Sequence, residues 1–221
     1  MLFRSSAGAD IVWTGAVSSD IFDEANWDLS NSTVTIVDPN VSIDDNILIM
    51  NAATPVEIPN ITGQARFQIG NGYTLTVDAS VLNTANNDGV GGAPGASLGP
   101  NVLVTNGGSF NTFFISNHTI LDINSGCSAT FGGGATPINS AAVNITAGAT
   151  LAFTDETPAA YISEHLHKTT VDGAPAVVDV NVQVVSDGAL GCIVTVIGLS
   201  GFYCTGDQGT CPCGNDNDGS T

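Results

Sequence analysis

Apolar and polar residues alternate over short stretches of this chain, and glycine, asparagine or proline separates many of these stretches. The clearest case is residues 73–77, Tyr-Thr-Leu-Thr-Val, where every second side chain is apolar. Such alternation places the apolar side chains on one face of a β-strand. Comparable runs occupy residues 34–37, 41–43, 47–49, 56–58, 67–69, 102–104, 113–115, 119–123, 143–145, 151–153, 177–185 and 193–197. The pattern predicts a chain built mainly from short strands.

A phrase of the form Ile/Val-x-x-Gly-x-x-apolar recurs where these runs end, and glycine at such a point allows a tight bend between strands. Its glycines are Gly72, Gly107, Gly126, Gly148 and Gly188, which lie 35, 19, 22 and 40 residues apart. Two gaps are close to twenty and two are nearer to twice that, as if a copy between them had decayed or been lengthened. A period of about twenty in a strand-rich chain indicates a β-solenoid, in which each turn packs against its neighbours.

We therefore predict an all-β fold, a right-handed parallel β-helix with a tryptophan-bearing N-terminal cap. A jelly-roll β-sandwich would explain the strands equally well, although not the recurring glycine phrase, and it stays open as the alternative. Residues 1–203 are expected to form a single solenoid domain.

Three segments depart from the strand pattern. Residues 83–100 are rich in glycine and asparagine without periodicity, and they predict a loop that projects from the stack. Residues 158–168 follow the sequence Thr-Asp-Glu-Thr, a helix-start signal, and predict a short helical insertion. Residues 204–221 contain little that could form a core, so we expect a Cys-rich C-terminal cap or a linker there.

The two tryptophans lie close to the N-terminus, in the sequences Trp13-Thr14-Gly15 and Ala25-Asn26-Trp27. This pair of motifs resembles the opening segment of bacterial extracellular β-helix surface proteins of the autotransporter-like and adhesin-like type. The resemblance implies that Trp13 and Trp27 seal the first turn of the solenoid, and that the protein serves display or adhesion rather than catalysis. The tail sequence Cys-Pro-Cys-Gly-Asn at 211–215 is similar to one in secreted proteins of planctomycete-type bacteria.

The charge of the chain excludes some partners. Twenty-one acidic residues face only three basic ones, which gives a formal net charge of -18. Such a surface repels phosphate, so we expect neither nucleic acid nor an anionic membrane as a partner. No apolar run reaches the length of a membrane span. The chain also has almost no lysine, the usual blocker of exposed strand edges, so its edges must be covered in another way or used for association.

An acidic surface attracts divalent cations, and calcium is the one cofactor that the sequence leaves open. Two acidic segments, 20–28 and 216–219, are similar to calcium loops, but neither has the complete ligand pattern. The metal site therefore stays unknown, and no other cofactor is predicted.

Five cysteines in a chain expected to be exported suggest disulfides. We expect Cys127 to pair with Cys192, because both follow a repeat glycine by a few residues and could lie on one side of the stack. Cys204 is expected to pair with either Cys211 or Cys213, which leaves one thiol free or intermolecular.

No catalytic motif emerges from the sequence. His165 and His167 would point about 200° apart on a helix, so we expect two surface histidines rather than a metal site. There is no Gly-x-Ser-x-Gly motif for a nucleophile. Cleavage of acidic sugars usually needs basic residues, which are scarce here, whereas glycoside hydrolysis by a pair of carboxylates stays open. We predict that the protein is not an enzyme.

The function predicted from the sequence is a non-enzymatic structural protein of the cell exterior or cell surface. It would be a self-associating subunit of a fibre, sheath or surface layer, or a segment of an adhesin, because an open solenoid has unpaired strands at both ends. Its main partner would then be other copies of the chain. The alternative is a glycan-binding or glycan-cleaving β-helix module, which would require a lateral groove with converging carboxylates and aromatic side chains.

Overall fold

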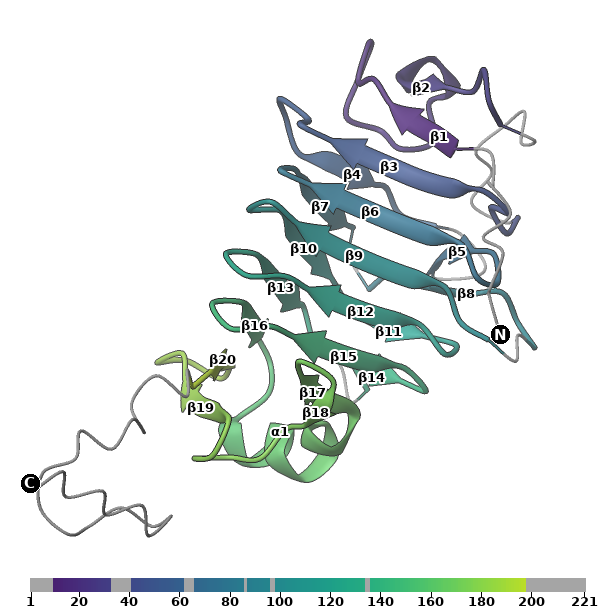
Figure 1. Ribbon diagram of the computed structural model, residues 1–221. Helices are drawn as coiled ribbons and strands as arrows, with labels where there is room; N and C mark the ends of the chain where they lie inside the picture. The colour runs from purple at the N-terminus through teal and green to yellow at the C-terminus, as the bar shows by residue number, and fades with distance from the viewer. Residues whose placement is uncertain are drawn as a thin grey trace, which may run out of the picture.

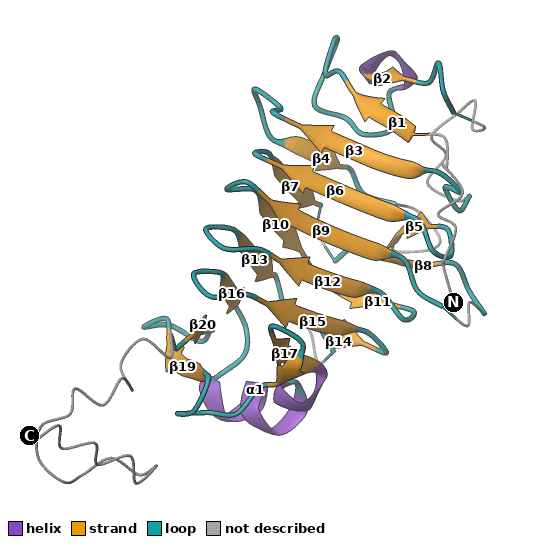
Figure 2. Ribbon diagram, viewed as in Figure 1, coloured by secondary structure: helices purple, strands orange, loops and turns teal. Residues whose placement is uncertain are grey.

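The computed structural model describes residues 10–32, 41–61, 66–85, 87–95, 98–133 and 136–197. These residues form a right-handed parallel β-helix of about five turns, as the sequence predicts (Figure 1). Each full turn contributes one strand to each of three sheets, called here sheets A, B and C. Within the described residues, helix occurs only at the two ends of the solenoid (Figure 2).

Sheet A has nine strands, sheet B seven and sheet C four. In sheet A the strands are β1 (Asp10–Trp13), β2 (Trp27–Asp28), β3 (Asn46–Met50), β6 (Thr74–Asp78), β9 (Asn101–Thr105), β12 (Ile120–Ile123), β15 (Ala142–Ile145), β17 (Thr169–Val171) and β18 (Ala174–Pro175). Sheet B contains β4 (Val56–Ile58), β7 (Val81–Thr84), β10 (Ser109–Thr112), β13 (Ser128–Phe131), β16 (Thr150–Phe153), β19 (Val182–Ser186) and β20 (Cys192–Val196). Sheet C contains β5 (Arg66–Ile69), β8 (Gly89–Gly92), β11 (Ile115–Ser116) and β14 (Ile138–Asn139).

The core consists of apolar side chains that stack in register from one turn to the next. Leu75, Val102, Leu121 and Val143 occupy one column of sheet A, and all four are fully buried. In sheet B the rings of neighbouring phenylalanines on β13 and β16 stack with centroids 5.2 Å apart. Each buried aliphatic or aromatic side chain stabilises the fold by about 1.5–3 kcal/mol. One column of such side chains therefore contributes more to the free energy of unfolding than most surface contacts.

The length of a turn varies along the solenoid. Side chains that meet between adjacent turns are 28 residues apart from β7 to β10, 19 from β10 to β13 and 22 from β12 to β15. The period of about twenty that the sequence predicts is therefore correct for the turns between β9 and β16. The earlier turns are longer, and the last turn, from β15 to β17, is longer as well because it holds the helical insertion.

The five repeat glycines all have positive φ angles, but they do not occupy equivalent positions. Gly107, Gly126 and Gly148, with φ of 80°, 75° and 85°, form the corner between sheets A and B in successive turns. Gly72 lies at the corner between sheets C and A, and Gly188 lies in the antiparallel hairpin of β19 and β20. The long gaps therefore compare different kinds of bend, and the gap from Gly72 to Gly107 also spans a corner between sheets A and B at Ala79, which has no glycine.

The earlier turns also have corners between sheets A and B, but these corners contain no glycine. Asn51 and Ala79 take the left-handed conformation there, with φ of 51° and 45°. The recurring glycine phrase therefore does not include these two corners. Asparagine tolerates the left-handed conformation, and alanine adopts it only where the surrounding turns hold the chain in place.

The prediction of a projecting loop at residues 83–100 is wrong in part. This segment contains the end of β7 and the whole of β8, which pairs in parallel with β5 and β11. Added Cβ atoms on Gly89, Gly91 and Gly92 would lie 2.4–2.6 Å from atoms of the next turn. Glycine is needed here because the backbones approach closely, and the composition that suggests a loop belongs to a tightly packed strand.

The N-terminal end of the solenoid is covered, as the tryptophan cap predicts. Trp13 and Trp27 are both buried and meet edge to face, with ring centroids 5.0 Å apart and planes at 80°. The indole Nε1 of Trp27 donates to the carbonyl of Ile21 at 2.7 Å. Strand β2 pairs antiparallel with β1, and single bridges from Asp20 and Ile43 extend sheets B and C. Among the described residues, the first turn therefore has no long unpaired strand.

The C-terminal end is covered by the predicted helical insertion, which consists of α1 (Pro158–Glu164) and the short helix η2 (Leu166–Lys168). Thr157 caps α1 by accepting a hydrogen bond from the amide of Ala160, and proline occupies the first turn, where its missing N–H has no consequence. Lys168 Nζ donates to the carbonyl of Ile138 on β14, at the edge of sheet C. The open solenoid ends expected from the sequence are therefore largely closed.

Two further expectations concern the C-terminal segment and membrane-spanning segments. The Cys-rich segment 204–221 lies outside the described residues. Within the described residues, none of the helices has both the length and the apolar character needed to cross a membrane.

The turn geometry predicts the effect of replacing a corner glycine. An added Cβ at Gly126 would contact nothing within 4 Å, so only the positive φ opposes a side chain. We expect Gly126→Ala to lower the free energy of unfolding by about 1 kcal/mol, measured by urea denaturation. Ser125→Ala, at the exposed preceding position of the same bend, should leave stability within about 0.5 kcal/mol of the parent. Equal effects of the two changes would contradict this account.

Candidate functional site

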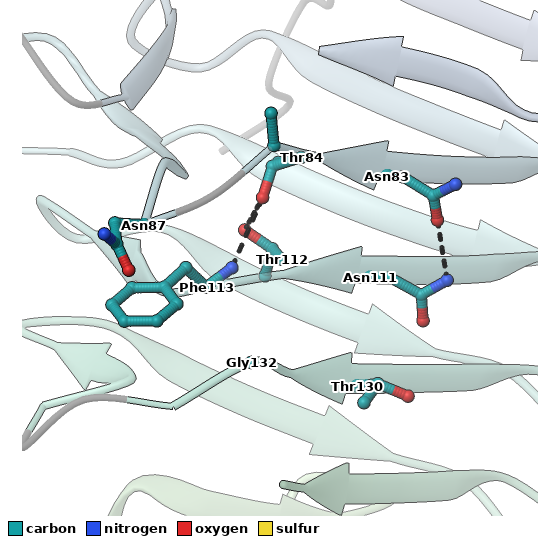
Figure 3. Close-up of a pocket in the computed structure, with 9 residues that line it drawn as sticks. Asn83, Thr84, Asn87, Asn111, Thr112, Phe113, Thr130 and Gly132 are labelled. Carbon is teal, nitrogen blue, oxygen red and sulfur yellow. Dashed lines mark hydrogen bonds between the residues drawn. The ribbon is translucent and has the colours of Figure 1, made fainter. Parts of the chain in front are cut away.

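A groove of about 470 Å³ lies on the outer side of sheet B. It lies where β7, β10 and β13 end and the chain turns towards sheet C (Figure 3). Its lining consists of Asn83, Thr84, Ala85, Asn87, Asn111, Thr112, Phe113, Thr130 and Gly132. A smaller hollow of about 250 Å³ lies near His118, at a corner between sheets C and A.

One side of the groove is a column of polar side chains on successive strands. Asn83, Asn111 and Thr130 are register partners on the outer face of sheet B (Figure 3). The Asn111 amide nitrogen donates to Asn83 Oδ1 at 2.8 Å, and the Asn83 nitrogen donates to Glu57 Oε1 at 2.8 Å. These bonds align the amides in one direction. Among the described residues, Asn111 Oδ1 and the Thr130 hydroxyl have no hydrogen-bond partner.

Two threonines hold the middle of the groove. The Thr84 hydroxyl donates to the carbonyl of Asp88 at 2.7 Å and accepts from the amide of Phe113 at 3.3 Å. The Thr112 hydroxyl donates to the carbonyl of Phe114 at 3.1 Å, and Thr112 is almost fully buried. Because their hydrogen bonds are internal, these threonines fix the backbone rather than offering groups to a ligand.

The other side of the groove carries the aromatic ring of Phe113 and the side chain of Asn87 (Figure 3). Asn87 lies in a turn with φ of 65°, and its exposed amide has no hydrogen-bond partner in the described residues. Gly132 lies beside the ring, and an added Cβ there would lie 3.4 Å from Phe113 Cδ2. The absence of a side chain at 132 therefore leaves this side of the groove open.

None of the described residues that line the groove is charged, although the chain carries a net charge of -18. Its free groups are amides, a hydroxyl and an aromatic ring, which can bind neutral hydrogen-bonding molecules. A pair of carboxylates at the separation needed for glycoside hydrolysis is not part of the lining. The described lining is suited to binding a neutral molecule through hydrogen bonds and one aromatic contact.

A second cluster of chemical interest lies buried inside the C-terminal cap. His165 Nε2 and Glu156 Oε1 lie 2.8 Å apart, and both residues are buried. The imidazole stacks on the ring of Phe153 at 6.0 Å. Tyr161 is fully buried beside it and donates its hydroxyl proton to Thr169 at 2.8 Å. The expectation of two surface histidines is therefore wrong for His165 and holds only for His167, because the helix turns one of them into the cap.

Burial determines where the proton of this pair resides. It is the main cause that raises the pKa of Glu156 to about 7, to which nearby Glu164 adds. Burial likewise lowers the pKa of His165 to about 4, with the charge of Lys168 as a second cause. At mildly acidic pH the carboxyl keeps its proton and donates it to the neutral imidazole. Because the pair is covered, it serves the structure of the cap rather than chemistry on a ligand.

The predicted disulfide between Cys127 and Cys192 is not formed, and both are buried free thiols. The carbonyl of Cys127 accepts from the amide of Thr150 at one end of β16, whereas Cys192 pairs with Phe153 at the other end. Three residues along a strand span about 10 Å, beyond the roughly 7 Å that a disulfide allows between Cα atoms. The prediction fails because Cys192 follows a hairpin glycine and not a solenoid corner. Cys204, Cys211 and Cys213 lie outside the described residues.

The acidic segment at residues 20–28 uses its carboxylates locally. Asp20, Asp23 and Asp28 each accept a hydrogen bond from a backbone amide two residues further on, at 2.8–3.1 Å. The bond from Ser30 lowers the pKa of Asp28. Within the described part of the chain, no three His, Cys, Asp or Glu side chains come together as metal ligands. The other calcium candidate, 216–219, lies outside the described residues.

The sequence contains a signal for the groove that the pattern of strands and glycines alone does not reveal. Strands β7 and β10 have the sequences Val-Leu-Asn-Thr and Ser-Phe-Asn-Thr, which share an apolar residue followed by Asn-Thr. In two adjacent turns the repeated Asn-Thr pair places an amide on the outer face of sheet B and a hydroxyl at the bend that leads to sheet C. Without the register, nothing indicates that the two copies are neighbours.

Comparison with models of protein families, with curated proteins and with solved structures found no match to this chain.

The buried pair predicts opposite pH responses of two variants, each compared with the parent. In Glu156→Gln, His165 remains with a pKa below its unfolded value of 6.5. The folded chain then binds fewer protons than the unfolded chain, so stability present above pH 6.5 is lost as the pH falls through about 4. In His165→Gln, Glu156 remains with a pKa above its unfolded value of 4.5, so stability present below pH 4.5 is lost as the pH rises through about 7.

In the parent the two contributions oppose each other, because folded and unfolded chains each hold one proton on the pair at intermediate pH. We expect the difference in unfolding free energy between each variant and the parent to change by about 1 kcal/mol over this interval, with opposite signs. Urea denaturation followed by tryptophan fluorescence from pH 4 to pH 8 measures it. Identical pH profiles for parent and variants would contradict the assignment.

Proposed function

We propose that this protein is a non-enzymatic structural component of the cell exterior that self-associates through its C-terminal end. The observation that supports the proposal is the outer edge of β19. Residues 183–186 have no strand on that side among the described residues, and only Val182 is bridged locally, by Val178. An edge of this kind is a template for pairing with another chain.

The other strand edges of the solenoid are short or blocked. Strands β2, β14 and β18 have two residues each, and β18 ends in Pro175. The edge of β4 is covered by hydrogen bonds with Ser19 and Ile21, and the edge of β5 by hydrogen bonds with Ile43. Self-association by β-pairing would therefore use β19 and give a tail-to-tail arrangement, rather than the stacking of open ends.

The sequence of β19 is suited to pairing with itself. Val-Gln-Val-Val-Ser carries no charge, so two antiparallel copies centred on Val184 would bring no like charges together on the strands. Such a pair has two-fold symmetry, the commonest symmetry of protein dimers. The same cap exposes five large apolar side chains, which also favours association. They are Ile162, Val177, Val180, Val185 and Leu190.

Two features support a location outside the cell: the composition of the chain and the covered ends of the solenoid. An acidic, lysine-poor chain folded as a solenoid with a sealed first turn suits a protein that stands outside the cell, where the resemblance to surface proteins also points. A catalytic function gains no support from the groove, since its lining lacks carboxylates. The protein would then act as a rigid element of a fibre, sheath, surface layer or adhesin.

A charge on the free edge should weaken self-association. We expect Val185→Lys to raise the dissociation constant of the dimer by about tenfold or more, because lysine on an edge strand opposes pairing. Val17→Lys is the matched control, since Val17 is exposed at the opposite end of the solenoid. It should associate like the parent. Sedimentation velocity over a range of concentrations measures the equilibrium, and negative-stain microscopy shows the arrangement of the subunits.

Salt provides a second test of the same proposal. Two chains of charge -18 repel each other, so raising NaCl from 50 mM to 500 mM should strengthen association by screening. A parent protein that stays monomeric at millimolar concentration in high salt would contradict self-association. Equal weakening by Val17→Lys and Val185→Lys would contradict the role of β19.

A further inference from the structure

We infer that the groove on sheet B binds a neutral, hydroxyl-rich glycan chain, with the chain running along the solenoid axis. This inference is independent of self-association, because the groove lies on a lateral face and the free edge of β19 lies in the C-terminal cap. It concerns binding alone and includes no cleavage step.

The charge of the ligand follows from the lining. An anionic ligand would meet a protein of net charge -18 without any lysine or arginine in the groove. The two described basic residues are elsewhere: Arg66 lies on β5 in sheet C, and Lys168 donates to the carbonyl of Ile138. A cation would find no carboxylate among the described residues of the lining. Either charged ligand would lose water without gaining an opposite charge in the groove. A neutral ligand avoids this desolvation cost.

The polar groups indicate a ligand that both donates and accepts hydrogen bonds. Asn111 Oδ1 is an acceptor without a partner in the described residues, the Thr130 hydroxyl can donate and accept, and the amide of Asn87 can do both. The bonds from Asn111 to Asn83 and from Asn83 to Glu57 hold two of the amides in place before the ligand arrives. Preorganised groups of this kind lower the entropic cost of binding. Sugar hydroxyls are the matching chemistry.

The aromatic ring supplies the apolar part of the site. Phe113 is half-buried and faces the groove across from the amide column (Figure 3). A sugar ring has one face of C–H groups, which packs on an aromatic ring while its hydroxyls reach polar partners. Gly132 keeps the side of this ring open. An aromatic surface beside a few placed polar groups is the usual composition of a small-ligand site.

The direction of the chain follows from the strand spacing. Asn83, Asn111 and Thr130 succeed one another along the solenoid axis at the inter-strand distance of about 4.8 Å. This spacing is close to the length of one sugar unit in an extended glycan, so successive units can meet successive turns. The groove is open to solvent, which suits a polymer that continues past both ends of the site.

The experiment measures binding of three neutral hexasaccharides by isothermal titration calorimetry: cellohexaose, maltohexaose and laminarihexaose. Hexagalacturonate is the anionic comparison. We expect at least one neutral hexasaccharide to bind with a dissociation constant between about 10 μM and 1 mM, typical of few hydrogen bonds and one stacked ring. Binding should be unchanged between 50 mM and 500 mM NaCl, because no charge is involved. Hexagalacturonate should not bind.

Two variants test the site without removing a group on which the fold depends. Gly132→Leu fills the open side of the groove, and its new Cβ would have only ordinary contacts. Thr130→Val removes a hydroxyl that has no partner in the described residues and keeps the side-chain shape. We expect Gly132→Leu to weaken binding at least tenfold and Thr130→Val to weaken it about fivefold.

Thr150→Leu is the matched control, because Thr150 faces outward on the same sheet and does not line the groove. It should bind like the parent, and circular dichroism and thermal unfolding should show that all three variants fold. The inference is overturned if none of the three neutral hexasaccharides binds at millimolar concentration, or if Gly132→Leu binds as tightly as the parent.

Discussion

The fold depends on one constraint: apolar side chains of each turn must fall in register with those of the turns on either side. The column of Leu75, Val102, Leu121 and Val143 illustrates it, since each side chain is fully buried only because the next turn covers it. A turn of a solenoid has no core of its own, so its stability comes from its neighbours. Turns of different length are tolerated as long as the inward positions still coincide.

This constraint applies to the inward positions, so the outer surface is free to vary. It also means that the turns at the two ends would expose apolar side chains unless another element covers them. On the outer face of sheet B the same register that stacks the core also aligns Asn83, Asn111 and Thr130, which is how short polar strands produce a groove. At the ends, turns without a neighbour are closed by other means. The tryptophan pair closes the first turn, and α1 with the antiparallel strands closes the last.

The C-terminal cap differs from the solenoid in how it stays together. Its interior holds a glutamate and a histidine rather than another apolar column, and burial keeps both members of the pair uncharged at mildly acidic pH. A buried pair that shares one proton avoids the cost of desolvating two charges. Among the described residues, the cap also carries the free edge of β19 and half of the exposed large apolar side chains, which favours association at this end.

The sequence by itself determined the class of fold, the tryptophan cap and the helical insertion. Those features depend on local signals: alternation of apolar residues, glycine at bends, and a capping threonine before a proline. It could not determine which bends are equivalent, because Gly72, Gly126 and Gly188 share a conformation but join different strands. For the same reason the sequence predicts a loop where strand β8 lies, and a disulfide between Cys127 and Cys192 that the structure does not contain.

The groove and the environment of His165 were decided by the tertiary structure alone. Asn83 and Asn111 are 28 residues apart in the chain and become neighbours only through the register of two turns. His165 is buried because the chain folds back over Phe153 after the last complete turn. Local sequence specifies the conformation of a segment, whereas the neighbours of a side chain follow from long-range packing, and no short stretch of this chain encodes that packing.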